Sequence, residues 1–313
     1  MSVHSKSQTA EPSELAGLAE SPALPELPHL PDVRHRSVTA RGVRFHIAET
    51  GPADGTPIVL VHGFPQHWYA WRHVMPLLAA AQHRVLAVDL RGFGWTEAAR
   101  HGYSTGSLAD DVIAVLDELG IPRAALVGHD WGGWVGFAAA LRHPERISAL
   151  VSVNMTHMWP EHRHVLPNLW RMWHTALIEH PPLGRFVLRR TGFAGFLLRH
   201  WSGDPGLWQR EDLHVYTDLL RDPGHARAGE QLNAAYVWQE IFRHPRGRYR
   251  TARLTVPTLI IGGERDVVIP PAVLEGGERH ADELRVVVVP QAGHLLPEER
   301  PEVVAEEVRK FVV

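Results

Sequence analysis

Continuous apolar runs alternate with helix-forming stretches in the middle of the chain. Four runs have the length and composition of buried β-strands: 57–61, 84–88, 124–127 and 147–153. Three stretches between them favour helices: 68–81, 107–119 and 134–141. This alternation is typical of a parallel sheet with helices on both of its faces.

The alternation stops after residue 154 and resumes near residue 258. Residues 155–250 contain helix-like segments rich in Trp, His and Arg, and no convincing strand. Four further elements are then expected: a strand at 258–261, a helix at 271–280, a strand at 286–289 and a helix at 301–311. The pattern predicts an α/β fold, a mostly parallel sheet flanked by helices, with a helical cap inserted over the strand ends. Open α/β sheets bind their ligands at those ends.

The N-terminal stretch has a different character. Residues 1–33 are rich in Pro, Ser, Glu and Ala without sustained periodicity, which favours a flexible leader. Residues 37–49 alternate as a strand pair, with Arg41-Gly42 at the hairpin turn. The expected organisation is a leader at 1–33, a core formed by 34–154 and 251–313, and a helical cap at 155–250.

Composition excludes several classes of function. The 313 residues carry a formal net charge of −3 and no basic run, which argues against a nucleic-acid partner. The chain has no Cys, so disulfides, thiolate catalysis and Cys-ligated metals are excluded. The 22 His residues are scattered without zinc-site spacing, so no metal or organic cofactor is expected. No segment resembles a signal peptide or a membrane span, so the cytoplasm is the expected location.

The stretch at 125–136 has the pattern of a nucleophile elbow. Gly128-His129-Asp130-Trp131-Gly132 follows an apolar strand and leads directly into a helix. Glycines are needed at so tight a turn, because side chains would clash with the strand and the helix. Asp130 is then presented at the carboxyl end of the sheet. Taken alone, the same residues also fit a simple turn in which Asp130 caps the helix.

Two further loops favour the catalytic interpretation. Asp266 lies just after the expected strand at 258–261, and His294 lies just after the strand at 286–289. Both therefore reach the same sheet edge as Asp130, in the order nucleophile, acid, His. In His62-Gly63-Phe64-Pro65, Pro65 has no amide proton, so the Phe64 amide is the candidate oxyanion-hole donor.

These four motifs, at 62–65, 128–133, 263–266 and 293–294, resemble the epoxide hydrolase branch of the α/β-hydrolase fold family. An Asp nucleophile is already ionised at neutral pH and can open an epoxide, which forms an alkyl ester. His294, held by Asp266, would then activate a water to hydrolyse that ester. The amides of Phe64 and Trp131 would meet the oxyanion.

The resemblance also implies ring-opening donors in the cap and an apolar substrate site. Tyr236 lies where the family's second cap Tyr is expected, and His174 stands in the place of the first. Tyr216 is interpreted as a packing residue. The substrate-binding side chains are expected to be Phe64, Trp131, Trp173 and Tyr236, with Trp134 either beside them or packed behind the elbow. The expected partners are a small apolar epoxide and water.

Two alternatives stay open. A haloalkane dehalogenase would use the same triad, and Trp131, Trp170 and Trp173 could hold its halide. Phe64 counts against the subtype that places Asn at that position. Fluoroacetate dehalogenases carry an Arg beside the nucleophile, and this Arg is absent here.

The second alternative is a catalytically weak binding module, although an intact triad argues against it. The sequence does not decide the oligomeric state, and a homodimer is one option.

Overall fold

The computed structural model describes residues 24–235, 249 and 251–312. Its centre is an eight-stranded sheet with the order β1-β2-β4-β3-β5-β6-β7-β8. β3 to β8 run parallel, and β1 and β2 form an antiparallel hairpin at one edge. The strands are β1 (Arg34–Ala40), β2 (Val43–Thr50), β3 (Thr56–Val61), β4 (His83–Val88), β5 (Ala124–His129), β6 (Ile147–Val153), β7 (Thr258–Gly263) and β8 (Leu284–Val289). The predicted mostly parallel sheet is confirmed.

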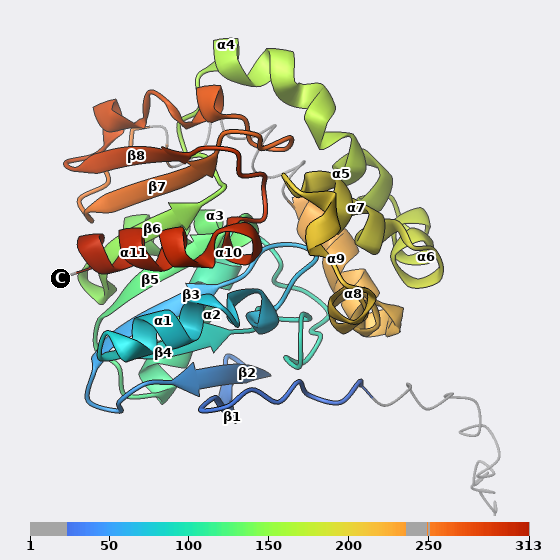
Figure 1. The fold of residues 1–313 in the computed structure, drawn as a ribbon, viewed down its shortest axis with the longest axis horizontal. Helices are drawn as coiled ribbons and strands as arrows, with labels where there is room; N and C mark the ends of the chain where they lie inside the picture. The colour runs from blue at the N-terminus through green and yellow to red at the C-terminus, as the bar shows by residue number, and fades with distance from the viewer. Residues whose placement is uncertain (1–23, 236–248, 250, 313) are drawn as a thin grey trace, which may run out of the picture.

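Helices cover both faces of the sheet (Figure 1). α2 (Thr105–Glu118) and α3 (Trp131–Arg142) pack on one face, and α1 (Val74–Ala80) and α11 (Pro301–Phe311) pack on the other. The central strands are apolar throughout because they are buried on both sides. In β3, for example, Val59 and Val61 join the first cluster, whereas Ile58 and Leu60 join the second. Three shorter helical elements also lie among these strands and helices in the chain: η2 (Trp68–Trp71), η3 (Pro144–Arg146) and α10 (Leu296–Glu299).

The chain between β6 and β7 forms a separate group of helices, here called the helical segment (162–235). Figure 1 shows it gathered at one end of the sheet. Its elements are α4 (His162–Val165), η4 (Leu166–Met172), α5 (Trp173–Ile178), α6 (Leu183–Arg190), α7 (Phe193–Trp201), η5 (Pro205–Leu207), α8 (Arg210–Thr217), η6 (Leu219–Arg221) and α9 (Pro223–Ala235). The helical segment contacts the strand ends. A Cβ at Gly229 of α9 would lie 3.1 Å from the Phe64 ring, which follows β3.

Three expected features differ from the structure. The helix expected at 68–81 is divided into η2 and α1. The helix expected at 271–280 is two 3₁₀ turns, η9 (Pro271–Leu274) and η10 (Gly277–His280), because Gly276 between them has φ +92° and breaks the helical path. Residues 24–33, expected in the flexible leader, lie against the molecule, where Leu27, Leu30 and Val33 pack on the α1/α11 side of the core.

The turn after β5 positions Asp130 at the end of the sheet. Asp130 has φ +51° and ψ −121°, a strained conformation for a residue with a side chain. Two glycines make room for it. A Cβ at Gly128 would lie 2.1 Å from the Gly132 carbonyl oxygen, and a Cβ at Gly132 would lie 2.1 Å from the Val61 carbonyl oxygen. The strand, the turn and the helix therefore approach so closely that only glycine fits.

Among the described residues, none of the helices combines the length and the apolar character needed to cross a lipid bilayer.

Replacing Gly132 with Ala tests this close approach. Because the new methyl group would overlap backbone, we expect Gly132→Ala to lower the free energy of unfolding by about 1–3 kcal/mol or more. Gly192→Ala is the matched control, since a Cβ at Gly192 has no atom within 4 Å. The control should stay within about 0.5 kcal/mol of the parent. Urea unfolding followed by circular dichroism measures both, and equal stability of the two variants would contradict the close approach.

Candidate active site

Three residues from three strand ends meet in one buried cluster. Asp130 follows β5, Asp266 follows β7 and His294 follows β8, and all three side chains are buried. His294 donates from Nδ1 to Asp266 Oδ2 at 2.8 Å, and its Nε2 lies 3.4 Å from Asp130 Oδ2. The imidazole therefore lies between two carboxylates, with Asp266 determining which ring nitrogen faces which partner.

Asp266 is held by its own set of donors. Its Oδ1 accepts from the amides of Val268 and Ile269, both at 2.8 Å. Its Oδ2 also accepts from Asn154 Nδ2 at 2.9 Å. Asn154 was missed in the sequence, although it directly follows β6 and so reaches the same sheet edge as the other three. The carboxylate has little freedom to rotate, and its hydrogen bond therefore fixes the plane of the His294 ring.

The amides predicted as oxyanion-hole donors both face Asp130. The Phe64 amide donates to Asp130 Oδ1 at 2.9 Å. The Trp131 amide also hydrogen-bonds the carboxylate and contributes to lowering its pKa. Two backbone N–H groups and the N-terminus of α3 therefore surround one carboxylate, and they can stabilise negative charge on it.

Charge in this cluster is mutually stabilised. Burial opposes protonation of His294, but the charges and hydrogen bonds of Asp266 and Asp130 outweigh it and raise the pKa of His294. Burial likewise opposes ionisation of Asp130, and the hydrogen bond and charge of His294 outweigh it and lower the pKa of Asp130. At neutral pH the resting cluster is therefore an imidazolium between two carboxylates. His129 beneath it donates to the His294 carbonyl at 2.8 Å, and burial lowers its pKa to about 4, so it is neutral.

Glu299 supports the loop that carries His294, and sequence reasoning missed it. Its carboxylate accepts from the amides on either side of His294, those of Gly293 at 2.8 Å and Leu295 at 3.0 Å. It also accepts from the amide of Gly203 at 3.0 Å, which comes from the helical segment. The His294 amide donates to the carbonyl of Trp201, the last residue of α7, at 2.9 Å. The backbone around His294 is therefore tied to the helical segment.

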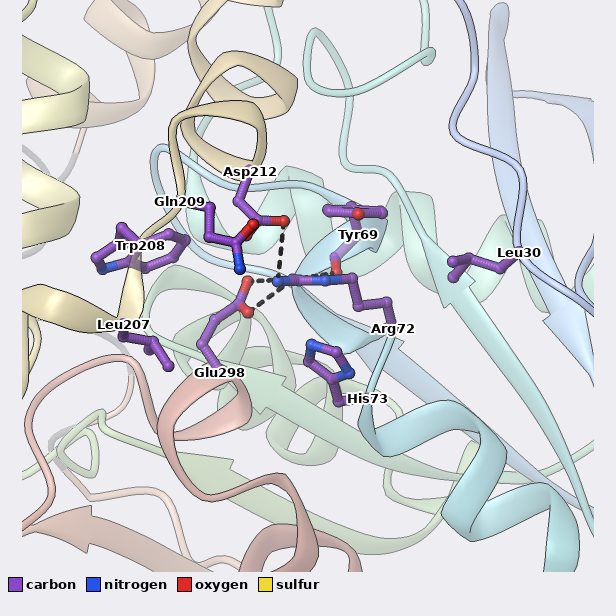
Figure 2. A pocket seen from close by; sticks show the side chains of 9 residues that line it. All are labelled: Leu30, Tyr69, Arg72, His73, Leu207, Trp208, Gln209, Asp212 and Glu298. Atoms are coloured by element: carbon purple, nitrogen blue, oxygen red, sulfur yellow. Dashed lines mark hydrogen bonds and ion pairs between the residues drawn. The ribbon is translucent and has the colours of Figure 1, made fainter.

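Glu298 makes a second connection to the helical segment, through Arg72 and Asp212 (Figure 2). Arg72 lies 2.6 Å from Glu298 Oε2 and 3.4 Å from Asp212 Oδ1 of α8. The Tyr216 hydroxyl, also from α8, donates to Glu298, whose pKa is raised by burial. Arg72, Asp212 and Glu298 border a pocket of about 440 Å³. Tyr216 is buried, as expected of a packing residue, and its ring contacts those of His67, Tyr69 and Trp208.

Two predicted residues of the helical segment, His174 and Trp173, differ in their burial. The His174 ring is buried and contacts the Trp201 ring at 4.8 Å, and Trp201 in turn contacts the His294 ring at 5.5 Å. Burial lowers the pKa of His174 to about 4. Trp173 is 41% exposed and its ring meets Phe193 at 5.7 Å, so a place in the substrate site stays a prediction.

Tyr236 lies outside the described residues. Trp134 packs behind the elbow, where its indole donates to the Thr156 carbonyl at 2.8 Å. Within residues 24–235, 249 and 251–312, His, Asp and Glu side chains form no group of three or more that could hold a metal ion.

The chain is similar in sequence and structure to known hydrolases. The family described as alpha/beta hydrolase fold matches residues 56–301. The chain is 31% identical to the soluble epoxide hydrolase of Corynebacterium sp. (strain C12) over 294 residues, which are 90% of this chain and 97% of that protein. It is 29% identical to bifunctional epoxide hydrolase 2 of Rattus norvegicus, covering 86% of this chain but only 54% of the rat protein. The solved structure of epoxide hydrolase CorEH superposes with a TM-score of 0.77 at 28% identity, covering 89% of this chain and 98% of CorEH.

Glu299→Gln tests whether the carboxylate supports the His294 loop. The Glu299 carboxylate accepts from three backbone amides, and a neutral Gln side chain would lack the negative charge that strengthens these hydrogen bonds. We therefore expect the free energy of unfolding to fall by about 1.5–3 kcal/mol. The Nδ1 proton of His294 should also exchange faster with water, as followed by NMR. Glu302→Gln, an exposed substitution in the first turn of α11, is the matched control. Unchanged proton exchange in Glu299→Gln would contradict the supporting role.

Proposed function

The chain belongs to the alpha/beta hydrolase fold family, and we propose that it hydrolyses epoxides to vicinal diols through an ester on Asp130. One observation carries the proposal. The residue at the nucleophile position is a buried carboxylate, and His294 contacts it at 3.4 Å while donating to Asp266 at 2.8 Å. A carboxylate can displace at saturated carbon, and its ester retains a carbonyl that water can attack. Named epoxide hydrolases among the relatives support the same reaction.

In the first step, an Asp130 oxygen attacks an epoxide carbon. The new ester C–O bond forms as the ring C–O bond breaks, and the ring oxygen becomes an alkoxide that needs a proton. We assign the donor to Tyr236, with His174 beside the site as the second hydrogen-bonding group. His174 is neutral because its pKa is lowered to about 4 by burial, so it can orient the ring oxygen but is a poor source of the proton.

Formation of the ester changes the state of His294. Asp130 loses its negative charge, which is one of the influences that raise the pKa of His294. The pKa therefore falls, and the proton can pass to the donor that protonated the alkoxide. His294 becomes the neutral base that the second step requires, while Asp266 keeps it oriented.

In the second step, His294 takes a proton from water, and the resulting hydroxide attacks the carbonyl carbon of the ester. We assign the stabilisation of the resulting oxyanion to the amides of Phe64 and Trp131, and their hydrogen bonds to Asp130 support this role. Collapse of the intermediate releases the diol, with its second hydroxyl proton taken from the new carboxylic acid. Asp130 is again a carboxylate and His294 an imidazolium. One epoxide and one water are consumed, and no metal is needed.

The helical segment is proposed to act as the cap over this site, within the expected boundaries 155–250. Its contacts with Phe64 and with the His294 loop support that arrangement, and Phe64, Trp131 and Trp173 are proposed to favour a small apolar substrate. The same three groups could also displace a halide, and halide release therefore distinguishes a haloalkane dehalogenase from an epoxide hydrolase.

Initial rates on styrene oxide and 1-bromobutane test the proposal. We expect diol from styrene oxide and no comparable bromide release. Asp130→Asn should lower kcat/KM on styrene oxide by on the order of a thousandfold or more. Asp117→Asn, a surface residue paired with Arg146, is the matched control and should leave the rate unchanged. Faster bromide release than diol formation would instead indicate a haloalkane dehalogenase, and full activity of Asp130→Asn would exclude the assigned nucleophile.

A further inference from the structure

The helical segment carries most of the exposed large apolar side chains of the described residues. Of ten such side chains, eight lie between residues 166 and 207. They are Leu166, Leu169, Trp170, Trp173, Leu183, Phe186, Phe196 and Leu207. Single exposed apolar residues are common on proteins, but a concentration in one segment marks an interaction surface.

These side chains form stripes rather than a random scatter. In η4, a 3₁₀ helix with about three residues per turn, Leu166 and Leu169 share one side, and Trp170 shares the neighbouring side with Trp173, where α5 begins. The Trp173 ring meets the Phe196 ring of α7 at 6.4 Å, which joins the two elements into one surface. The outward side of a surface helix is normally polar. Here Trp170 is 67% exposed and Phe196 is 48% exposed. The run from α4 to α6 forms an outer edge of the molecule (Figure 1).

The first part of the helical segment, which carries these apolar side chains, is cationic. Residues 162–210 contain seven Arg and two acidic residues, Glu179 and Asp204, whereas residues 211–235 contain two Arg and five acidic residues. Glu179 is buried, so it does little to neutralise the surface. Five arginines line a groove of about 690 Å³ between α6, α7 and α8: Arg189, Arg190, Arg199, Arg210 and Arg221. Within the described residues, Arg190 and Arg199 have no hydrogen-bond or ion-pair partner.

The apolar stripe and the arginine groove are adjacent. Phe196 and Arg199 lie one turn apart on α7, and both side chains are exposed. Leu183, Phe186 and Arg190 occupy the exposed side of α6 in the same way. Each helix therefore presents aromatic or aliphatic side chains together with a free guanidinium group. Helices that lie in a membrane interface combine Trp, Phe and Leu with Arg. Their aromatic rings enter the headgroup region, and their guanidinium groups bind the lipid phosphates.

We propose that this surface, formed by η4, α5, α6 and α7, docks on a lipid bilayer that carries anionic phosphate headgroups. Charge complementarity favours this occupant over a second copy of the chain. A two-fold contact would place the arginine-rich surface against itself, and like charges in an interface disfavour association. The surface would bind peripherally, with the arginine groove receiving headgroups and the Trp and Phe rings inserted beside them.

Flotation of the full chain with vesicles tests the proposal without reference to any enzymatic activity. The probes are vesicles of phosphatidylcholine alone and of an equimolar mixture of phosphatidylcholine and phosphatidylglycerol. We expect binding to the mixed vesicles that weakens as salt is added, and much weaker binding to phosphatidylcholine alone. Absence of binding to the mixed vesicles at low salt would overturn the proposal, as would equal binding to the two compositions.

Two double variants locate the contact. Arg190→Gln with Arg199→Gln should weaken binding about 25-fold, because each arginine near an anionic surface contributes about fivefold. Trp170→Ser with Phe196→Ser should weaken binding at every salt concentration. The matched controls lie outside the helical segment: Arg279→Gln with Arg285→Gln, and Val288→Ser, whose side chain is 41% exposed.

The controls should bind like the parent, and all variants change exposed side chains, so circular dichroism should show unchanged folding. Equal loss in controls and test variants would contradict the assigned surface. Sedimentation velocity supplies the last comparison. A dimer that Trp170→Ser with Phe196→Ser dissociates would assign the surface to a second copy of the chain and overturn the membrane proposal.

Discussion

A buried cation between two carboxylates is the interaction on which the rest of this molecule depends. The His294 imidazole lies 2.8 Å from Asp266 and 3.4 Å from Asp130, with all three side chains removed from water. Charges are costly to bury singly, and removal of one member of a buried pair costs about 3–5 kcal/mol. The cluster can form only if three strand ends reach the same point. The parallel register of β5 to β8 and the strained turn at Asp130 provide that convergence.

The loop that carries His294 is supported by groups on both sides of it. Glu299 accepts from the amides of Gly293 and Leu295, and the same carboxylate accepts from Gly203 of the helical segment. Glu298 pairs with Arg72 and receives the Tyr216 hydroxyl. A displacement of the helical segment would therefore be transmitted to the proposed base. The hydrogen bonds from Gly203 to Glu299 and from His294 to the Trp201 carbonyl form this mechanical connection.

Sequence reasoning was most successful where the signal was local. The apolar runs identified the strands from β3 to β8, and the loops that follow three of them carry Asp130, Asp266 and His294. Asn154 follows β6 and could have been found by the same rule. Glu298 could not, because its role arises from a partner far away in the chain, Arg72. Glu299 could not either, because no sequence pattern shows that its carboxylate accepts from the backbone amides of a loop. The helix expected at 271–280 failed because one glycine at φ +92° outweighed the helical spacing around it.

The proposed ester on Asp130 is the central claim, and it can be observed directly. His294→Gln leaves the nucleophile in place and removes the base of the second step, so an ester should accumulate. After a single turnover with styrene oxide, mass spectrometry of the folded variant should show the Asp130 peptide heavier by the mass of the intact epoxide. A folded variant that binds styrene oxide but leaves the Asp130 peptide unmodified, or carries the added mass on another residue, would contradict the account.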